Sequence, residues 1–195
     1  MHNKDILDLL KDSGAFLEGH FLLTSGRHSN KYIEKFRLLE SPKYLDKVCK
    51  RMSEQFDPNE GDIVLGAAIG GILLSSGVAK YFGKKGIFTE RVNGKMELRR
   101  GFYIKDNSKV IIVEDIVWTG GSIFELIDVV KDCNAIVYGI TSIVDRNIKP
   151  VNFDFDYKPL VNHPVESWDQ NEIPEWLNKI PITKRGRSGK WDFSF

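Results

Sequence analysis

The sequence lacks the features that mark secreted, membrane-bound and disulfide-rich proteins. Its two cysteines, Cys49 and Cys133, do not have the spacing of a metal site, which indicates free thiols in a reducing compartment. The first ten residues include Lys4, Asp5 and Asp8 where a signal peptide would have an apolar stretch. We therefore expect a cytoplasmic protein.

Charge of one sign and long apolar runs are also scarce. The net charge of +1 gives no overall attraction to nucleic acid or to a membrane surface. Residues 63–79 form an uncharged run of 17 residues, which is short of the roughly 20 residues of a membrane helix. That run also contains four glycines, so a buried strand, a loop and a helix explain it better than a membrane span.

What the chain does contain is the composition of one globular domain. It has 195 residues, of which 42% are hydrophobic and 28% charged. A chain of this length can bury a sizeable core. Strand-like runs alternate with helix-like runs, which favours an α/β fold whose parallel sheet presents its ligands at the carboxyl ends of the strands.

One stretch, residues 109–130, carries most of the chemical information. It begins with the apolar, β-branched run Val110–Val113, which is typical of a strand buried on both faces of a parallel sheet. We expect that strand to end at the acids Glu114 and Asp115. A glycine turn follows, and then apolar residues recur with helical spacing at Ile123, Leu126, Ile127 and Val130.

The order of strand, acids, glycine turn and helix suits a phosphorylated sugar. Gly120 and Gly121 let backbone N–H groups converge at a helix N-terminus, where a phosphate binds well. The acids can accept hydrogen bonds from sugar hydroxyls or hold Mg²⁺ through water. Neither a Walker A lysine nor the six-residue Rossmann glycine pattern is present. An acidic helix cap with a glycine turn is the competing structural interpretation.

Two motifs resemble a known family. Residues 114–122, Glu-Asp-Ile-Val-Trp-Thr-Gly-Gly-Ser, resemble the motif by which type I phosphoribosyltransferases bind phosphoribosyl pyrophosphate (PRPP). Residues 19–29, Gly-His-Phe-Leu-Leu-Thr-Ser-Gly-Arg-His-Ser, resemble the N-terminal signature of the orotate phosphoribosyltransferases. The resemblance extends over about residues 6–146. It implies an α/β fold with a central parallel sheet flanked by helices and a small N-terminal hood.

The resemblance also implies a domain plan and an activity. We expect a single domain with a hood at about 1–35, a core at about 36–160 and a tail at about 161–195. The implied reaction transfers phosphoribosyl from PRPP to orotate, giving orotidine 5′-monophosphate and pyrophosphate in pyrimidine biosynthesis. It implies Mg²⁺, bound through PRPP and water near Asp115 and not held directly by the protein, and a homodimer. Neither a membrane nor nucleic acid is an expected partner.

The implied site divides into three sets of residues. The catalytic set is Glu114, Asp115, Arg91 and Lys95. The PRPP-binding set is Glu114, Asp115, Ile116, Val117, Trp118, Thr119, Gly120, Gly121 and Ser122, together with Gly70 and Gly71 of a second glycine-rich loop, residues 66–71. The base-binding set is Trp118, Arg146 and Thr24.

Several of these assignments have structural alternatives. The glycines at 66–71 could instead serve close packing of a helix on a strand. The basic hairpin at 90–101, with its Asn93-Gly94 turn, could be a solvated surface element instead of a loop that closes over pyrophosphate. Arg146 would face the orotate carboxylate, or it could form an ion pair with Asp145 or another acid.

Two residues depart from the family pattern. Trp118 stands where orotate enzymes usually have Thr, and Thr24 stands where some members have Lys. Trp118 leaves the identity of the base open, so a phosphoribosyltransferase for another base is an alternative. A PRPP-sensing regulator that binds nucleic acid is a further alternative, motivated by the basic cluster at 184–190, which could equally be a solvated tail.

The remaining patterns predict the other elements. A short helix around Ile6 should stop at Ser13-Gly14, and a longer one should start at Ser41-Pro42 and end before Pro58. Strands are predicted at 62–65, 86–89 and 135–144, with a helix after the loop at 66–71 that closes at Gly83. One small helix is predicted within 168–180.

Overall fold

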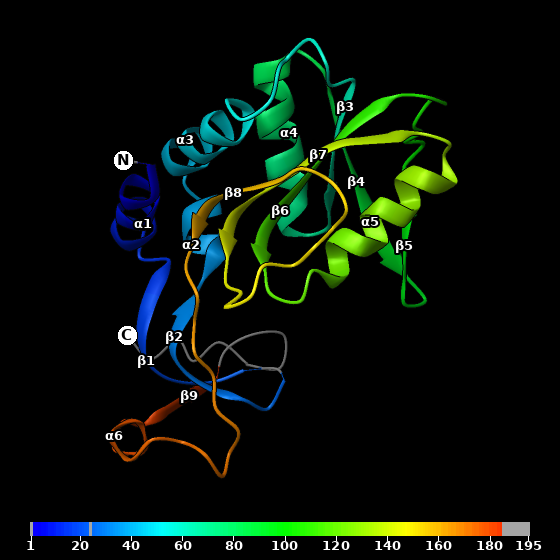
Figure 1. Ribbon diagram of the computed structural model, residues 1–195. Helices are drawn as coiled ribbons and strands as arrows, with labels where there is room; N and C mark the ends of the chain where they lie inside the picture. Colours follow the sequence, from blue (N-terminus) through cyan, green and yellow to red (C-terminus); the bar gives the residue numbers. More distant parts are fainter. Residues whose placement is uncertain (1, 24, 185–195) are drawn as a thin grey trace.

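A parallel sheet with helices on both faces forms the body of the molecule (Figure 1). The computed structural model describes residues 2–23 and 25–184. Within them, six strands pair in the order β5-β4-β3-β6-β7-β8. All neighbours are parallel except the hairpin of β4 and β5. The strands are β3 Ile63–Ala67, β4 Lys85–Val92, β5 Lys95–Leu98, β6 Lys109–Val117, β7 Ile136–Asp145 and β8 Tyr157–Asn162.

The helices form two layers around this sheet (Figure 1). On one face lie α1 His2–Asp12, α3 Pro42–Ser53 and α4 Gly70–Phe82, and on the other lies α5 Gly121–Asp132. A second sheet, β2-β1-β9, stands below the carboxyl ends of the core strands. Its strands are β1 Phe16–Leu22, β2 His28–Ile33 and β9 Ile182–Lys184, and the short helices α2 Lys35–Leu39 and α6 Glu175–Asn178 complete the described chain.

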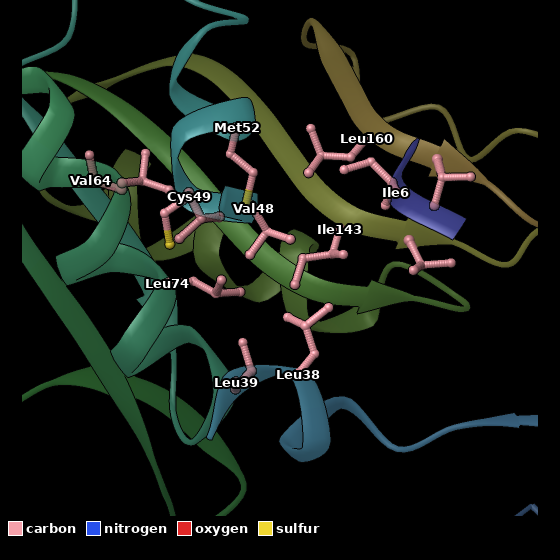
Figure 2. Close-up of a cluster of buried hydrophobic side chains, with 14 of the residues drawn as sticks. Ile6, Leu38, Leu39, Val48, Cys49, Met52, Val64, Leu74, Ile143 and Leu160 are labelled. Atoms are coloured by element: carbon pink, nitrogen blue, oxygen red, sulfur yellow. The ribbon is translucent and has the colours of Figure 1, made fainter. Parts of the chain in front are cut away.

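The alternation of side chains along the central strands gives each face its own apolar core. Ile111 and Val113 of β6 face α3 and α4, whereas Val110 and Ile112 face α5. Figure 2 shows the first of these cores, where labelled side chains from α1, α2, α3, α4 and the strands β3, β7 and β8 point toward one another. Each fully buried Leu or Ile contributes roughly 1.5–3 kcal/mol relative to an exposed position. These two cores fix the end of β6 on which the site is built.

Most predicted elements are confirmed. The helix at Ile6 ends before Ser13, α3 begins directly after its cap at Ser41, and α4 ends at Gly83, whose φ of +62° is left-handed. The uncharged run at 63–79 is β3, a loop and α4. Among the described residues, every helix is too short or too polar to cross a bilayer.

Three features differ from the predictions. Strand β6 runs on to Val117, because residues up to Val117 pair with β7, so the two acids lie inside the strand and not at its end. Strand β8 was not predicted. The tail helix is only α6, because Trp168 forms a backbone bridge with His28 of the hood. The division at about 35 and 160 stays a prediction, although β9 of the tail pairs with β1 of the hood.

Candidate functional site

Two adjacent buried acids stand near the carboxyl end of β6. Glu114 is 8% exposed and Asp115 is 3% exposed. The two carboxyl groups are close enough to interact, although successive strand residues point to opposite faces. The N–H of Asp115 donates to Glu114 Oε1 at 2.9 Å, and the N–H of Ile116 donates to Asp115 Oδ1 at 2.7 Å. The backbone thus holds one oxygen of each carboxyl group and leaves the other for a partner.

The electrostatic environments of the two acids differ. Burial raises the pKa of Glu114 well above its usual range, and the neighbouring charge of Asp115 raises it further. Asp115 has a cation in contact, since Lys35 Nζ lies 2.6 Å from its Oδ2. Lys35 begins α2 and was not among the predicted site residues. In the described part of the chain, no three His, Cys, Asp or Glu side chains converge to hold a metal ion.

The loop after β6, residues 118–121, joins the strand to α5 and encloses a small cavity of about 120 Å³. Glu114 and residues 116–123 line this cavity, whereas Asp115 does not. Gly120 has a left-handed φ of +79°, and a Cβ there would lie 2.6 Å from Phe153 Cε1. Thr119 Oγ1 accepts a long hydrogen bond of 3.4 Å from the N–H of Gly121. The loop therefore needs glycine at 120 and presents its backbone at the start of a helix, as predicted for a phosphate site.

The second glycine-rich loop, residues 66–71, reaches the same place. Gly66 and Gly71 lie back to back, so a Cβ on either would be within 3 Å of the other's backbone. A Cβ on Gly70 would overlap Asp115 Oδ2. The glycines thus do serve close helix-to-strand packing, and the same packing brings the start of α4 against the acid pair. Gly70 thus lies against Asp115 of the PRPP motif, and the role of Gly70 and Gly71 in binding pyrophosphate stays a prediction.

The basic hairpin at 90–101 has its cations engaged elsewhere. Asn93 and Gly94 both have positive φ, which confirms the turn. Arg91 donates to both carboxylate oxygens of Glu125 on α5, at 3.1 and 2.6 Å, and to the Gly94 carbonyl at 2.7 Å. Lys95 begins β5 and is exposed. The structure does not bring Arg91 to the acid pair, so its role over pyrophosphate, like that of Lys95, stays a prediction.

Arg146, directly after β7, is a buried cation that has no acidic partner within residues 2–23 and 25–184. It is 9% exposed, and its Nε and Nη2 have no hydrogen-bond partner among the described residues. Asp145 instead accepts from the backbone and side-chain amides of Asn147, which argues against the predicted alternative of an Asp145–Arg146 pair. Burial lowers the pKa of Arg146. A buried guanidinium with free donors is chemically suited to bind an anion.

Trp118 lies against this guanidinium. The Arg146 Cζ is 4.9 Å from the centroid of a Trp118 ring, within the range of a cation–π contact. The structure thus brings together the predicted base-binding residues Trp118 and Arg146. Thr24, the third of them, lies outside the described residues.

Sequence reasoning missed Lys35 and the contacts that hold the hood together. His20 and His28 are buried and share a hydrogen bond of 2.7 Å between Nε2 and Nδ1, while His20 Nδ1 donates to the Ile180 carbonyl. The local sequence does not signal these contacts. Lys35 and Asp115, and His20 and Ile180, are far apart in the chain. His20 and His28 are near one another, but the segment between them mixes polar and apolar residues without a clear pattern. The motif Gly19–Ser29 marks the hood without revealing which side chains it buries.

A larger cavity, about 690 Å³, lies at the opposite end of the sheet. Its lining residues include Asp62, Lys85 and Ser108, which stand where β3, β4 and β6 begin. Ligands of open α/β sheets bind at the carboxyl ends of the strands. The smaller cavity at residues 114–123 is therefore the candidate site.

Comparisons with known proteins agree with this geometry. A model of the phosphoribosyl transferase domain matches residues 37–178. The chain is 41% identical over 186 residues to an orotate phosphoribosyltransferase of Thermoanaerobacter sp., covering 95% of this chain and 98% of that one. It is 40% identical over 186 residues to one of Desulforamulus reducens, covering 95% and 97%. A solved orotate phosphoribosyltransferase of Aeropyrum pernix superposes with a TM-score of 0.65 at 26% identity, covering 80% and 93%.

Proposed function

Because this chain belongs to the phosphoribosyltransferase family, among its orotate phosphoribosyltransferases, we propose that it transfers phosphoribosyl from PRPP to orotate in pyrimidine biosynthesis. The products are orotidine 5′-monophosphate and pyrophosphate. The observation that carries the choice of base is Arg146, a buried guanidinium with free donors beside the PRPP motif. Orotate is a flat ring with a carboxylate, the group that a guanidinium binds best.

Different residues of the chain would bind different parts of PRPP and orotate. The PRPP loop, with Thr119, Gly120, Gly121 and Ser122, would bind the 5′-phosphate at the start of α5. Glu114 and Asp115 would accept hydrogen bonds from the ribose hydroxyls. Gly70 and Gly71 would receive the pyrophosphate. Arg146 would bind the orotate carboxylate, and Trp118 would border the base while it supports the Arg146 guanidinium.

This arrangement suits a reaction that needs positioning more than a nucleophilic side chain. A ring nitrogen of orotate attacks C1 of the ribose, and its proton passes to the departing pyrophosphate or to water. The bond from C1 to the pyrophosphate oxygen breaks, and its electron pair leaves with that oxygen. Holding both reactants in line and excluding water supply much of the acceleration.

Mg²⁺ is part of the proposal. The donor set fits an ion carried by the substrate, since no third His, Cys, Asp or Glu of the described chain joins Glu114 and Asp115, and Mg²⁺ usually keeps waters and substrate phosphates as ligands. When bound, it would supply positive charge to the pyrophosphate. The residues near it would be Asp115 and the loop at 66–71.

We also propose a cytoplasmic homodimer. Two cysteines without a disulfide, Cys49 buried and Cys133 partly so, support a reducing compartment. Ile69 in the loop at 66–71 and Leu73 in α4 are 72% and 42% exposed, and they support an apolar contact between copies. Size-exclusion chromatography with light scattering measures the molar mass and tests the dimer. A monomer at micromolar concentration would contradict the proposed dimer.

The decisive experiment follows the loss of orotate absorbance with PRPP and Mg²⁺, alongside a panel of other bases. Turnover of orotate above that of the other bases is expected. No turnover of orotate, with PRPP still protecting the fold against heat, would mean that the pocket around Trp118 serves another base. Asp115→Ala should abolish turnover while the protein remains folded by circular dichroism. Unchanged turnover would remove Asp115 from the site.

A further inference from the structure

Lys35 brings a positive charge into the site from the hood side. It is the first residue of α2 and follows β2 closely in the chain. Its Nζ lies 2.6 Å from Asp115 Oδ2, and its side chain is 33% exposed whereas that of Asp115 is 5% exposed. The carboxylate therefore lies underneath, and the ammonium covers it on the side open to solvent.

The position of that carboxylate oxygen says which part of the substrate Lys35 would meet. Asp115 Oδ2 lies so close to Gly70 that a Cβ on Gly70 would overlap it. Gly70 begins α4 and belongs to the loop at 66–71 that is proposed to receive pyrophosphate. The ammonium of Lys35 is thus at the boundary between the ribose part and the pyrophosphate part of the site. The bond that breaks in the reaction joins those two parts.

The other cations proposed for pyrophosphate are not at this place. Arg91 is held by Glu125 and by the Gly94 carbonyl, and Lys95 is an exposed residue at the start of β5. Lys35, by contrast, contacts the buried acid pair itself. A lysine also suits a change of partner, because its charge is compact and its four-carbon stem is flexible.

We propose that Lys35 is a further binding residue for PRPP, whose ammonium leaves Asp115 when the ribose hydroxyls arrive and then binds the pyrophosphate. This rests on the proposed function, which assigns Asp115 to the ribose. As the bond from C1 to oxygen breaks, negative charge grows on the departing oxygen, and Lys35 stabilises it while keeping its own proton. In the empty site the same ammonium neutralises the acid that will later bind sugar.

The exchange makes Asp115 and pyrophosphate competitors for one cation, and this has a measurable consequence. The test is calorimetric titration of inorganic pyrophosphate into the free protein, without added divalent metal. Pyrophosphate carries no ribose, so Asp115 keeps its attraction for the Lys35 ammonium during the titration. Lys35→Met should weaken its binding about tenfold or more, the scale of one hydrogen bond between charged groups. Asp115→Asn should strengthen it several-fold, since the ammonium no longer leaves a charged partner. The double variant should bind as Lys35→Met does.

Steady-state kinetics with each substrate varied in turn distinguish an effect on PRPP and its leaving pyrophosphate from an effect on orotate. Lys35→Met should lower kcat/KM for PRPP by about 10²-fold, the usual effect of losing one group that stabilises developing charge. The KM for orotate should change little. Lys35→Arg keeps the charge and should recover most of the loss. Lys80→Met is the matched control, because Lys80 pairs with Asp46 at 2.8 Å on the surface of α3 and α4, and it should behave as wild type.

Three results would overturn the proposal. One is unchanged pyrophosphate binding in Lys35→Met, and another is the absence of any gain in Asp115→Asn. The third is a loss of turnover in Lys35→Met with unchanged pyrophosphate affinity, which would make Lys35 a structural partner of Asp115 alone. Lys35→Gln serves in every assay if the Met variant does not fold. Failure of wild type to use orotate would refute the proposed function and leave the pyrophosphate titrations as a test of Lys35.

Discussion

Gly120→Ala is expected to destabilise the protein more than a comparable glycine substitution elsewhere, and to impair PRPP binding. Gly120 has a φ of +79°, and a new Cβ would lie 2.6 Å from Phe153 Cε1 and 2.9 Å from its Cζ. A non-glycine residue in the left-handed region costs about 1–2 kcal/mol. Overpacking a filled core adds about 1–3 kcal/mol.

The second contribution applies because Phe153 cannot easily move. It is 3% exposed, and its ring packs against Phe124 and Tyr157 with centroid separations of 5.0 and 5.1 Å. The total expected loss in the free energy of unfolding is therefore about 2–5 kcal/mol. For a chain of this size that corresponds to a fall in Tm of roughly 4–20 °C.

Gly83→Ala is the control that separates the two contributions. Gly83 also has a left-handed φ, +62°, but a Cβ there would have nothing within 4 Å. It should cost only the backbone part, about 1–2 kcal/mol. Urea unfolding of both variants gives the difference, which is expected to be about 1–3 kcal/mol.

A double-mutant cycle with Phe153→Ala tests whether crowding by the Phe153 ring causes the extra loss in Gly120→Ala. In a Phe153→Ala background, the cost of Gly120→Ala should fall toward that of Gly83→Ala, because the obstructing ring is gone and only Val151 Cγ1, at 3.1 Å from the new Cβ, still crowds it. PRPP should protect Gly83→Ala against heat as well as it protects wild type, and should protect Gly120→Ala less. Equal costs for the two glycine variants in the wild-type background would refute the packing argument. Full PRPP protection of Gly120→Ala would refute the role of the loop.

Three further outcomes follow from the site and the hood. Arg146→Lys should raise the KM for orotate about tenfold or more while leaving the KM for PRPP nearly unchanged, because a lysine cannot form the bidentate pair; equal effects on both would contradict the assignment. Burial, and then the neighbouring His20, lower the pKa of His28 below 6.5. As the pH falls, the His28 imidazole is therefore protonated at a higher pH in the unfolded chain than in the folded protein. Stability should consequently fall as pH drops below about 6.5, and His28→Gln should show a shallower fall in urea midpoints between pH 7.5 and 5.5. Chelating Mg²⁺ should abolish orotate turnover without lowering Tm in the absence of substrate, and a large fall in Tm would instead indicate a structural metal.

The site segment could be predicted from the sequence because its signals are local. The β-branched run of β6, the acids, the glycine turn and the helical spacing of α5 lie within one stretch, so short-range pattern and motif suffice. The end of β6 was misplaced, since the acids there stay in the strand only through pairing with β7. Register between strands is a non-local property, and no single segment encodes it.

The parts that could not be predicted depend on contacts across the chain. Strand β8 contains Pro159, which argues against a strand, yet β8 is an edge strand, where proline is tolerated. Trp168 leaves the predicted tail helix because its backbone pairs with that of His28 in both directions, at 2.8 Å. The ion pair of Lys35 with Asp115 joins residues far apart in sequence, and no spacing rule would connect them.

The hood sheet also has a consequence for how the protein is made. Strand β1 lies between β2, its neighbour in the chain, and β9, which is the last strand described. Translation delivers β9 only after the whole core sheet has left the ribosome. A nascent chain that ends before Trp168 can therefore close its core around β6 but has no strand to complete the hood. The PRPP motif would form during synthesis, and the sheet β2-β1-β9 would be completed only at the end.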